Sequence, residues 1–366
     1  MCSNREDKNT LYSLIRRSLG TSDGGFYTLA QIQNAMLLGR QQGVSSIVFD
    51  GFQKSKDGCP GITQNEYIRL KTEWLMDLGQ AINSHQIIHQ AEELINERLK
   101  KDGIKALVLK GSAFASYYDV PEVRQFGDID IYSPTEFESI DAILKEIGRN
   151  HELECYRHTH CTVNGITVEN HIYLTDARWK KKWMPLEEYL SMEAERDLDI
   201  KQEPGLCYPD AMFSIVFYLY HTLAHLVYEH INVRFLLDWF YLIKKSGHID
   251  EGVLKEKLED FGLLKIAGVV TNLCVERLGM NSGSVPSFIM EESNKVPSAL
   301  IQKIEDDMFD TNHEGFTTSS LKDRVKRIQK YYLNRWKIEQ LLGVSYFQFI
   351  WEKVSSICKW NGDKKL

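Results

Sequence analysis

The sequence lacks the features that mark several large classes of protein. Its seven cysteines form no Cys-x-x-Cys pair, which argues against a zinc cage, and their odd number and scatter argue against a disulfide framework. This usage is typical of free or buried thiols in a reducing compartment. No internal repeat and no low-complexity segment occurs.

A long hydrophobic run is also missing. The most apolar segment, 211–220, is interrupted by His221 and His225 and is shorter than the ~20 residues that a membrane-spanning helix needs. The polar first residues are not followed by the apolar segment of a signal peptide. We therefore expect no membrane span and a cytoplasmic location.

The chain has no excess of positive charge. Its net charge of −7 argues against a general nucleic-acid coat protein, although a local basic patch stays open. The 366 residues, 43% hydrophobic and 26% charged, are enough for two domains, or for one large domain with an attached helical bundle.

Helical periodicity occupies both ends of the chain. Residues 1–103 are expected to form an N-terminal helical region with helices over 11–19, 28–38 and 65–101, the last ended by Gly103. Residues 181–366 are expected to form a C-terminal helical domain without a strand beyond 184; its helices are expected over 210–228, 233–245, 251–278 and 320–358.

The middle segment, 104–180, has strand signals. Apolar residues over 104–109 predict a buried strand, and a short helix over 113–118 follows with Ser112 as its N-cap. Strict alternation predicts a strand over 128–132, followed by a helix from Ser133-Pro134 to about 147. Asn164-Gly165 predicts a hairpin between runs 153–163 and 166–174. The fold class expected is α+β, a small mixed β-sheet flanked by helical regions.

Two carboxylates mark the chemistry of this segment. Asp128 and Asp130 stand two apart on a strand, so both side chains lie on one face with Cβ atoms about 7 Å apart. Such a pair needs a cation between its members, and oxygen-only ligands favour Mg²⁺. If Glu169 lies beside them, three acids would hold two Mg²⁺ ions, or Mn²⁺ in their place.

Other polar residues around this strand suit phosphate binding. Gly111 permits a close backbone approach, Ser112 offers a hydroxyl at a helix start, and Lys110 and Arg124 offer positive charge. Arg124 can equally clamp the aspartate loop. His171 lies two residues from Glu169, where it can contact substrate or fill a polar edge.

The segment LKGSAFASYY…VRQFGDIDIY with the later VENHIYL resembles the polymerase-beta-like nucleotidyltransferase superfamily and, more narrowly, the bacterial uncharacterised nucleotidyltransferase family. The likeness is strong over 104–174 and weaker to about 245, where a His-rich helix and an Arg-x-x-x-Asp follow. The resemblance implies that Asp128, Asp130 and Glu169 bind metal, and that Gly111 and Ser112 form the nucleotide-binding turn.

The sequence thus predicts a Mg²⁺-dependent nucleotidyltransferase that moves a nucleoside monophosphate from an NTP to a small-molecule, protein or RNA acceptor and releases pyrophosphate. A non-catalytic nucleotide-binding protein of the same fold stays open, because fifteen residues separate Ser112 from Asp128. An RNA-directed transferase also stays open, since 178–183 and 321–340 are locally basic.

Three patterns in the predicted hairpin and C-terminal helices have plainer explanations. His221, His225 and Glu229 share one helical face, and we expect that helix to pack behind the site. Arg234 and Asp238 are expected to form an ion pair within their helix. His158 and His160 are expected to be ordinary hairpin residues.

Overall fold

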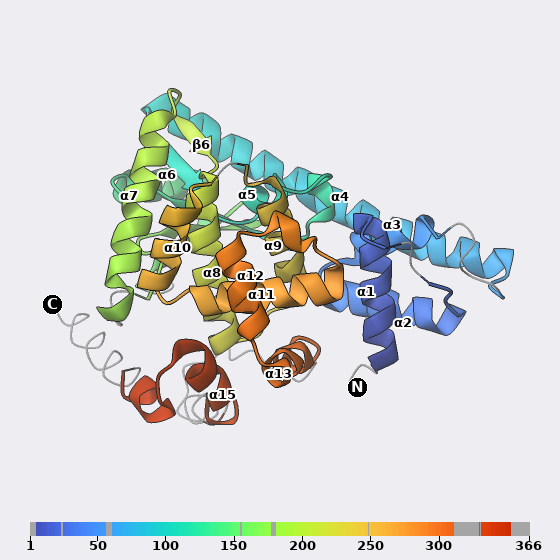
Figure 1. The fold of residues 1–366 in the computed structure, drawn as a ribbon. Coiled ribbons are helices and arrows are strands. Elements are labelled where there is room, and N and C mark those ends of the chain that lie inside the picture. Colours follow the sequence, from blue (N-terminus) through green and yellow to red (C-terminus); the bar gives the residue numbers. More distant parts are fainter. Residues whose placement is uncertain are drawn as a thin grey trace.

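The computed structural model describes residues 5–22, 25–55, 61–153, 156–176, 181–247, 249–310, 329 and 331–352. A six-stranded mixed sheet lies among helices from both ends of the chain (Figure 1). The strand order is β3-β4-β5-β2-β1-β6. The bounds are β1 Lys105–Val108, β2 Asp128–Tyr132, β3 Arg149–Leu153, β4 His158–Val163, β5 Ile166–His171 and β6 Gly205–Cys207. The α+β class is confirmed.

The pairing of β2 with β5 decides which side chains meet. The two strands are parallel, with Asp130 opposite Glu169 and Tyr132 opposite His171. The predicted hairpin is confirmed, because β4 pairs antiparallel with β5 and the connecting Asn164 and Gly165 have φ of 51° and 84°. Positive φ at both positions is the requirement of the tight turn that Asn-Gly favours.

Two strands were not predicted. β3 is an exposed edge strand whose sequence, RNHEL, has no apolar alternation. β6 has three residues and pairs in parallel with β1, although no strand was expected beyond 184. A strand this short is held by backbone pairing and leaves no periodicity to read.

The helices before the sheet are α1 Arg5–Leu19, α2 Leu29–Gln41, α3 Ser45–Gln53 and α4 Gln64–Asp102, and those within it are α5 Ser112–Ala115 and α6 Phe137–Ile147. The long helix α4 was predicted within a residue or two. Thr63 and Glu66 form a capping box at its start, and Gly103 ends it with φ of 73°. The N-cap of α5 is Gly111 and not Ser112, which is a correction.

The later helices are α7 Met184–Ile200, α8 Ala211–Tyr228, α9 Val233–Lys245, α10 Glu251–Asp260, α11 Leu264–Leu273, α12 Ser287–Lys295, α13 Ser298–Met308 and α15 Arg335–Lys337. The predicted helix over 251–278 was wrong as a single element, because Gly262 with φ of 66° separates α10 from α11. Helices α7, α12 and α13 were not predicted. The helix expected over 320–358 was also wrong as a single element, because Gly343 with φ of 66° interrupts it. Residues 320–328, 330 and 353–358 of that prediction lie outside the described residues.

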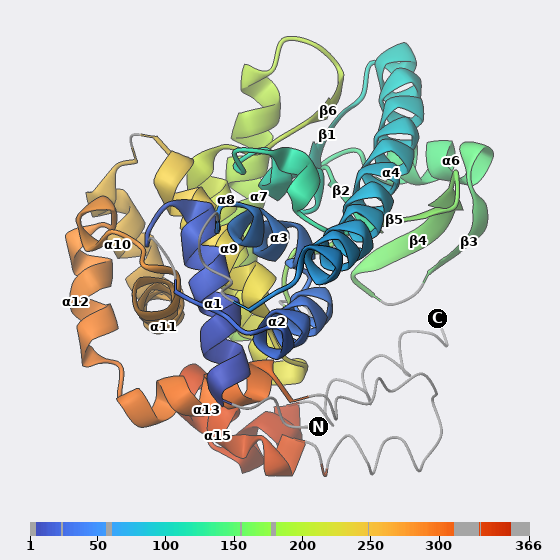
Figure 2. The ribbon, with the colours of Figure 1, turned by 90° about the vertical axis from the view of Figure 1, so that its right-hand side faces the viewer.

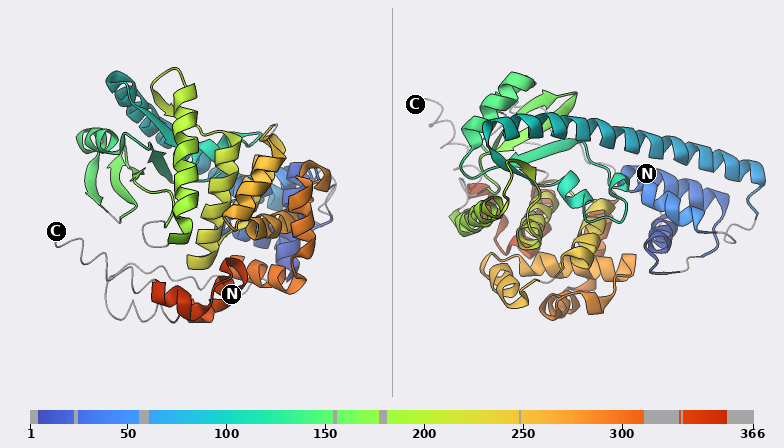
Figure 3. Two further views of the ribbon diagram at one scale, coloured as in Figure 1. Left: turned by 60° about the vertical axis from the view of Figure 1, so that its left-hand side comes forward. Right: turned by 90° about the horizontal axis from the view of Figure 1, so that it is seen from above.

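Each face of the sheet has its own cover. Ile129 and Ile131 pack with α4 and α6 in one core, through Ile95 and Ile140 among others. Leu107 and other residues of the opposite face join a larger core with α7, α8 and α9. Figure 2 shows α4 beside β2 and β5, and Figure 3 shows it running on to α1–α3. The alternation of β2 therefore directs its aspartates away from α4, toward α8 and α9.

Among the described helices, α8 alone is long and apolar enough to cross a membrane. About two thirds of it, 67%, is buried inside the fold, where it is a core helix.

The close crossing of α1 and α3 generates a stability prediction. A Cβ at Gly51 would lie 1.9 Å from the carbonyl oxygen of Leu14, whereas one at Gly79 on the exposed side of α4 would meet nothing within 4 Å. We expect Gly51→Ala to destabilise the protein by about 1–3 kcal/mol or more because backbone must move. Gly79→Ala should stabilise it by up to about 1 kcal/mol. Denaturant unfolding measures both, and equal effects would contradict the packing described.

Candidate active site

The carboxylate of Asp130 is at the centre of the site. Its side chain has no exposed surface, and Oδ1 lies 2.7 Å from Nζ of Lys110 and 2.9 Å from Nε2 of His171. Burial opposes its charge, but Lys110 and His171 outweigh burial and hold the pKa of Asp130 well below its usual range. Its second oxygen, Oδ2, is buried without a hydrogen-bond partner among the described residues.

Asp128 and Glu169 adjoin this centre from the two parallel strands. Burial and the neighbouring Asp130 raise the pKa of Asp128, whose partly buried side chain lines a cavity. Oε2 of Glu169 lies 3.4 Å from Nε2 of His171 and 3.8 Å from Nδ1 of His158. Burial opposes the charge of Glu169, but the hydrogen bond with His171 leaves its pKa lowered. The three predicted acids therefore converge.

The turn before α5 has little room. Gly111 has φ of 49°, and a Cβ there would lie 2.9 Å from the ring of Phe126 and 3.2 Å from the carbonyl oxygen of Asp128. Glycine at this position lets the turn approach β2 closely. The neighbouring Ser112 directs its hydroxyl to the carboxylate of Glu92 on α4, and it is not among the residues that line the cavity. Its predicted nucleotide contact stays a prediction.

Arg124 holds this turn from within. Its guanidinium makes two hydrogen bonds to Asp238, of 2.7 and 2.9 Å, and a third of 3.0 Å to the carbonyl oxygen of Gly111. Tyr118 donates to the same Asp238 at 2.7 Å. Of the two roles open to Arg124, the structure shows the clamp, and contact with phosphate stays a prediction.

The expected ion pair between Arg234 and Asp238 was wrong. Asp238 is occupied by Arg124, and Arg234 instead donates to the carbonyl oxygen of Gln125 at 2.6 Å. Spacing of four residues suggested a partner within α9. Asp238 instead has a bidentate partner, Arg124, from outside α9. The spacing of residues within one helix does not reveal such a partner.

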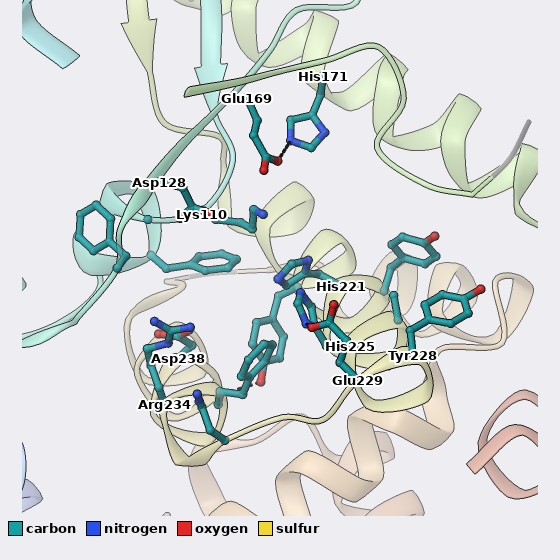
Figure 4. A pocket seen from close by; sticks show the side chains of 18 of the residues that line it. Lys110, Asp128, Glu169, His171, His221, His225, Tyr228, Glu229, Arg234 and Asp238 are labelled. Atoms are coloured by element: carbon teal, nitrogen blue, oxygen red, sulfur yellow. Dashed lines mark hydrogen bonds and ion pairs between the residues drawn. The ribbon is translucent and has the colours of Figure 1, made fainter. Parts of the chain in front are cut away.

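A cavity of about 500 Å³ separates the acids from α8 and α9. Figure 4 shows Glu169 and His171 on one side, Lys110 and Asp128 beside them, and His221, His225 and Arg234 on the other. This volume is within the range of small-molecule sites. The helix expected to pack behind the site instead contributes a wall of it.

The second wall is rich in nitrogen donors. The rings of His221 and His225 lie 4.3 Å apart, and Nδ1 of His225 is 3.0 Å from Glu229. Burial, then His225 and Lys110, lower the pKa of His221 well below its ordinary value, so its imidazole is neutral at pH 7. Arg157 also lines the cavity. An anionic ligand would therefore meet positive charge from Lys110, Arg157 and Arg234.

The donor set fits divalent metal at the acidic end. Asp130 keeps a buried oxygen without a partner among the described residues, and Asp128 lies beside it with a raised pKa. A cation placed there would satisfy the first group and relieve the repulsion felt by the second. The structure thus supplies a reason for metal that does not depend on motif spacing.

The sequence did not indicate several residues that line this cavity, among them Arg157, His158, His221, His225 and Arg234. A signal existed for His158, because the Asn-Gly turn sets the hairpin register that places it opposite His171. No local signal placed α8 over the sheet. Residues 178–180 of the first basic segment, and 321–328 and 330 of the second, lie outside the described residues.

Comparison with known proteins gave one family. A family model described as "Uncharacterised nucleotidyltransferase" matches residues 29–279, which is more than half of the chain. No curated protein and no solved structure matched.

The opposite pKa shifts of the two aspartates predict opposite effects on stability. The pKa of Asp128 is raised in the folded protein, so ionisation of Asp128 lowers the free energy of unfolding as pH rises. The pKa of Asp130 is lowered in the folded protein, so ionised Asp130 stabilises the fold, and this stabilisation is lost as pH falls. In EDTA at pH 7, Asp128→Asn should raise Tm and Asp130→Asn should lower it. As pH falls, the Asp128 difference should shrink first, through its raised pKa, and the Asp130 difference should shrink only below the ordinary carboxyl pKa. Shifts of the same sign would contradict this electrostatic description.

The clamp on Arg124 predicts a large loss of stability. Asp238→Asn leaves a buried guanidinium without its counter-charge, and we expect a loss of about 3–5 kcal/mol in urea unfolding. Glu146→Gln is the matched control, since Glu146 makes a bidentate pair with Arg98 at the surface. That change should cost less than about 1 kcal/mol. Similar losses in the two variants would refute the clamp.

Proposed function

The chain belongs to the uncharacterised nucleotidyltransferase family, and we propose that it transfers a nucleoside monophosphate from an NTP to an acceptor with release of pyrophosphate. The observation that carries this proposal is the convergence of Asp128, Asp130 and Glu169 at one end of a cavity that Lys110, Arg157 and Arg234 also line. Mg²⁺, or Mn²⁺, is the proposed cofactor, and the proposed location is the cytoplasm.

The three acids are proposed to hold the metal. Asp128 and Asp130 would supply oxygen ligands, and Glu169 would be the ligand on the acceptor side. When bound, the two ions would lower the pKa of the attacking hydroxyl and neutralise charge on the phosphates. Lys110 now neutralises Asp130 at 2.7 Å, so it is placed to transfer this interaction to a phosphate when metal binds.

The reaction follows from this placement of groups. An acceptor oxygen forms a bond to the α-phosphorus, and the bond from that phosphorus to the β-phosphate oxygen breaks. The acceptor proton passes to the carboxylate of Glu169, whose Oε2 lies 3.4 Å from Nε2 of His171. Pyrophosphate leaves, and Lys110 and Arg234, which both line the cavity, would stabilise its charge.

The turn and the second wall orient the nucleotide. Arg124 fixes the carbonyl of Gly111, so the backbone of this turn is held in place for a phosphate. The neutral imidazole of His221 can hydrogen-bond a sugar or base without adding charge. The acceptor class, whether small molecule, protein or RNA, is not specified by these contacts.

One observation favours the second candidate, a nucleotide-binding protein without turnover. Asp130 already has two cationic or hydrogen-bonding partners, Lys110 and His171, so a site that keeps both contacts would bind nucleotide without recruiting metal to this carboxylate. The partnerless Oδ2 of Asp130 weighs the other way.

The test is transfer of label from each of four α-³²P NTPs with Mg²⁺ or Mn²⁺, alone and with cell extract. We expect the unmodified protein to label an acceptor, and Asp128→Asn to reduce transfer by more than about 100-fold, the upper end of losses caused by outer-shell changes at metal sites. Glu152→Gln is the control, because its exposed carboxylate on β3 contacts His160 and not the cavity.

The outcomes separate the candidates. Label or pyrophosphate released by the unmodified protein and by Glu152→Gln, but not by Asp128→Asn, supports transfer. Nucleotide that binds equally to all three proteins with no transfer in any of them would replace this proposal with the binding protein.

A further inference from the structure

A cluster of mixed nitrogen and oxygen ligands lies beside the aspartates. His158, Glu169 and His171 each offer one ligand atom, and the three atoms lie within 4.8 Å of one another. Within the described part of the chain this is the one such group. The predicted metal site contained only the carboxylates.

The hairpin register creates the cluster. His158 on β4 stands directly opposite His171 on β5, and their ring centroids are 5.1 Å apart. Glu169 is two residues before His171, so the period of two puts both on one face. Oε2 of Glu169 then lies 3.4 Å from one imidazole and 3.8 Å from the other.

These separations suit a tetrahedral ion. With bonds of about 2.0–2.2 Å, neighbouring ligands of such an ion lie roughly 3.3–3.6 Å apart. Small rotations of the side chains would bring all three atoms to this distance. Hard Mg²⁺ prefers oxygen, whereas imidazole suits Zn²⁺, Co²⁺ and other divalent transition metals.

The surroundings of His171 support the same conclusion. Nε2 of His171 faces two carboxylates, Asp130 at 2.9 Å and Glu169 at 3.4 Å. The carboxylate of Asp130 is itself fully buried and is fixed by Lys110. An ion bound to Nε2 would therefore place positive charge where two negative groups already converge. Oδ2 of Asp130 has no partner in the described part of the chain and so remains able to contact an ion.

We propose that His158, Glu169 and His171 form a metal position that takes a divalent transition-metal ion in preference to Mg²⁺. This inference deepens the proposed function and rests on it, since the position is the acceptor-side half of the same centre. Asp128 and Asp130 would keep the oxygen-only half for Mg²⁺. The centre would then hold two different metals, distinguished by the two imidazoles.

The experiment uses the full chain stripped of metal and titrated with Co²⁺ in excess Mg²⁺, without nucleotide. Calorimetry and the visible absorption of Co²⁺ report affinity and nitrogen coordination. We expect one tight Co²⁺ site, weakened at least about 10-fold in His158→Gln. His160→Gln is the matched control, two residues along the same strand face, where His160 lies 3.2 Å from Glu152. It should bind Co²⁺ as the unmodified protein does.

A second measurement does not depend on the folding of a variant. Pulsed EPR of the unmodified protein loaded with Mn²⁺ should show coupling to imidazole nitrogen. Absence of that coupling, or Co²⁺ affinity unchanged in a folded His158→Gln, would overturn the proposal.

Failure of this proposal is distinguishable from failure of the proposed function. Nitrogen coordination without label transfer would leave the metal position standing and remove the transferase. Label transfer with Mg²⁺ that needs Asp128 but shows no nitrogen coordination would do the reverse.

Discussion

Burial of the Asp130 carboxylate is the constraint on which the rest of the site depends. A carboxylate without exposed surface must be compensated where it stands, and Lys110 by its charge and His171 by a hydrogen bond do this from two different elements. Those partners in turn fix the end of β1 and the end of β5 against β2. The arrangement leaves one oxygen unused and a second acid, Asp128, repelled by its neighbour, so the fold holds a site whose charge is balanced only in part.

The sequence was sufficient for local features and insufficient for those that depend on distant partners. The period of two in Asp128–Tyr132, the Asn-Gly turn and the Gly103 stop were all readable, because each is decided by neighbouring residues. The sequence did not predict that β2 pairs with β5; the three-acid site was predicted only on the condition that Glu169 lies beside the aspartates. β6 was invisible, since three residues paired through their backbone carry no pattern.

The same division applies within the site. Spacing identified the carboxylates, which lie on two strands of one segment. It gave Asp238 the wrong partner and put His221 and His225 behind the site, because the approach of α8 and α9 to the sheet is decided by packing over the whole core. The sequence motif therefore identifies the residues on the acidic side of the cavity and none of those on the opposite wall.

The long sequence separation between Arg124 and Asp238 limits how the segment with the aspartates can be transferred between genes. Arg124 and Asp238 are 114 positions apart, and their contact fixes the turn at Gly111. The segment that contains the aspartates therefore cannot form this site by itself. If it were transferred to another protein, the acids would be present, but Asp238, the partner of Arg124, would be missing. Gene fusion or recombination would preserve this site only if the whole segment from α4 to α9 were transferred together.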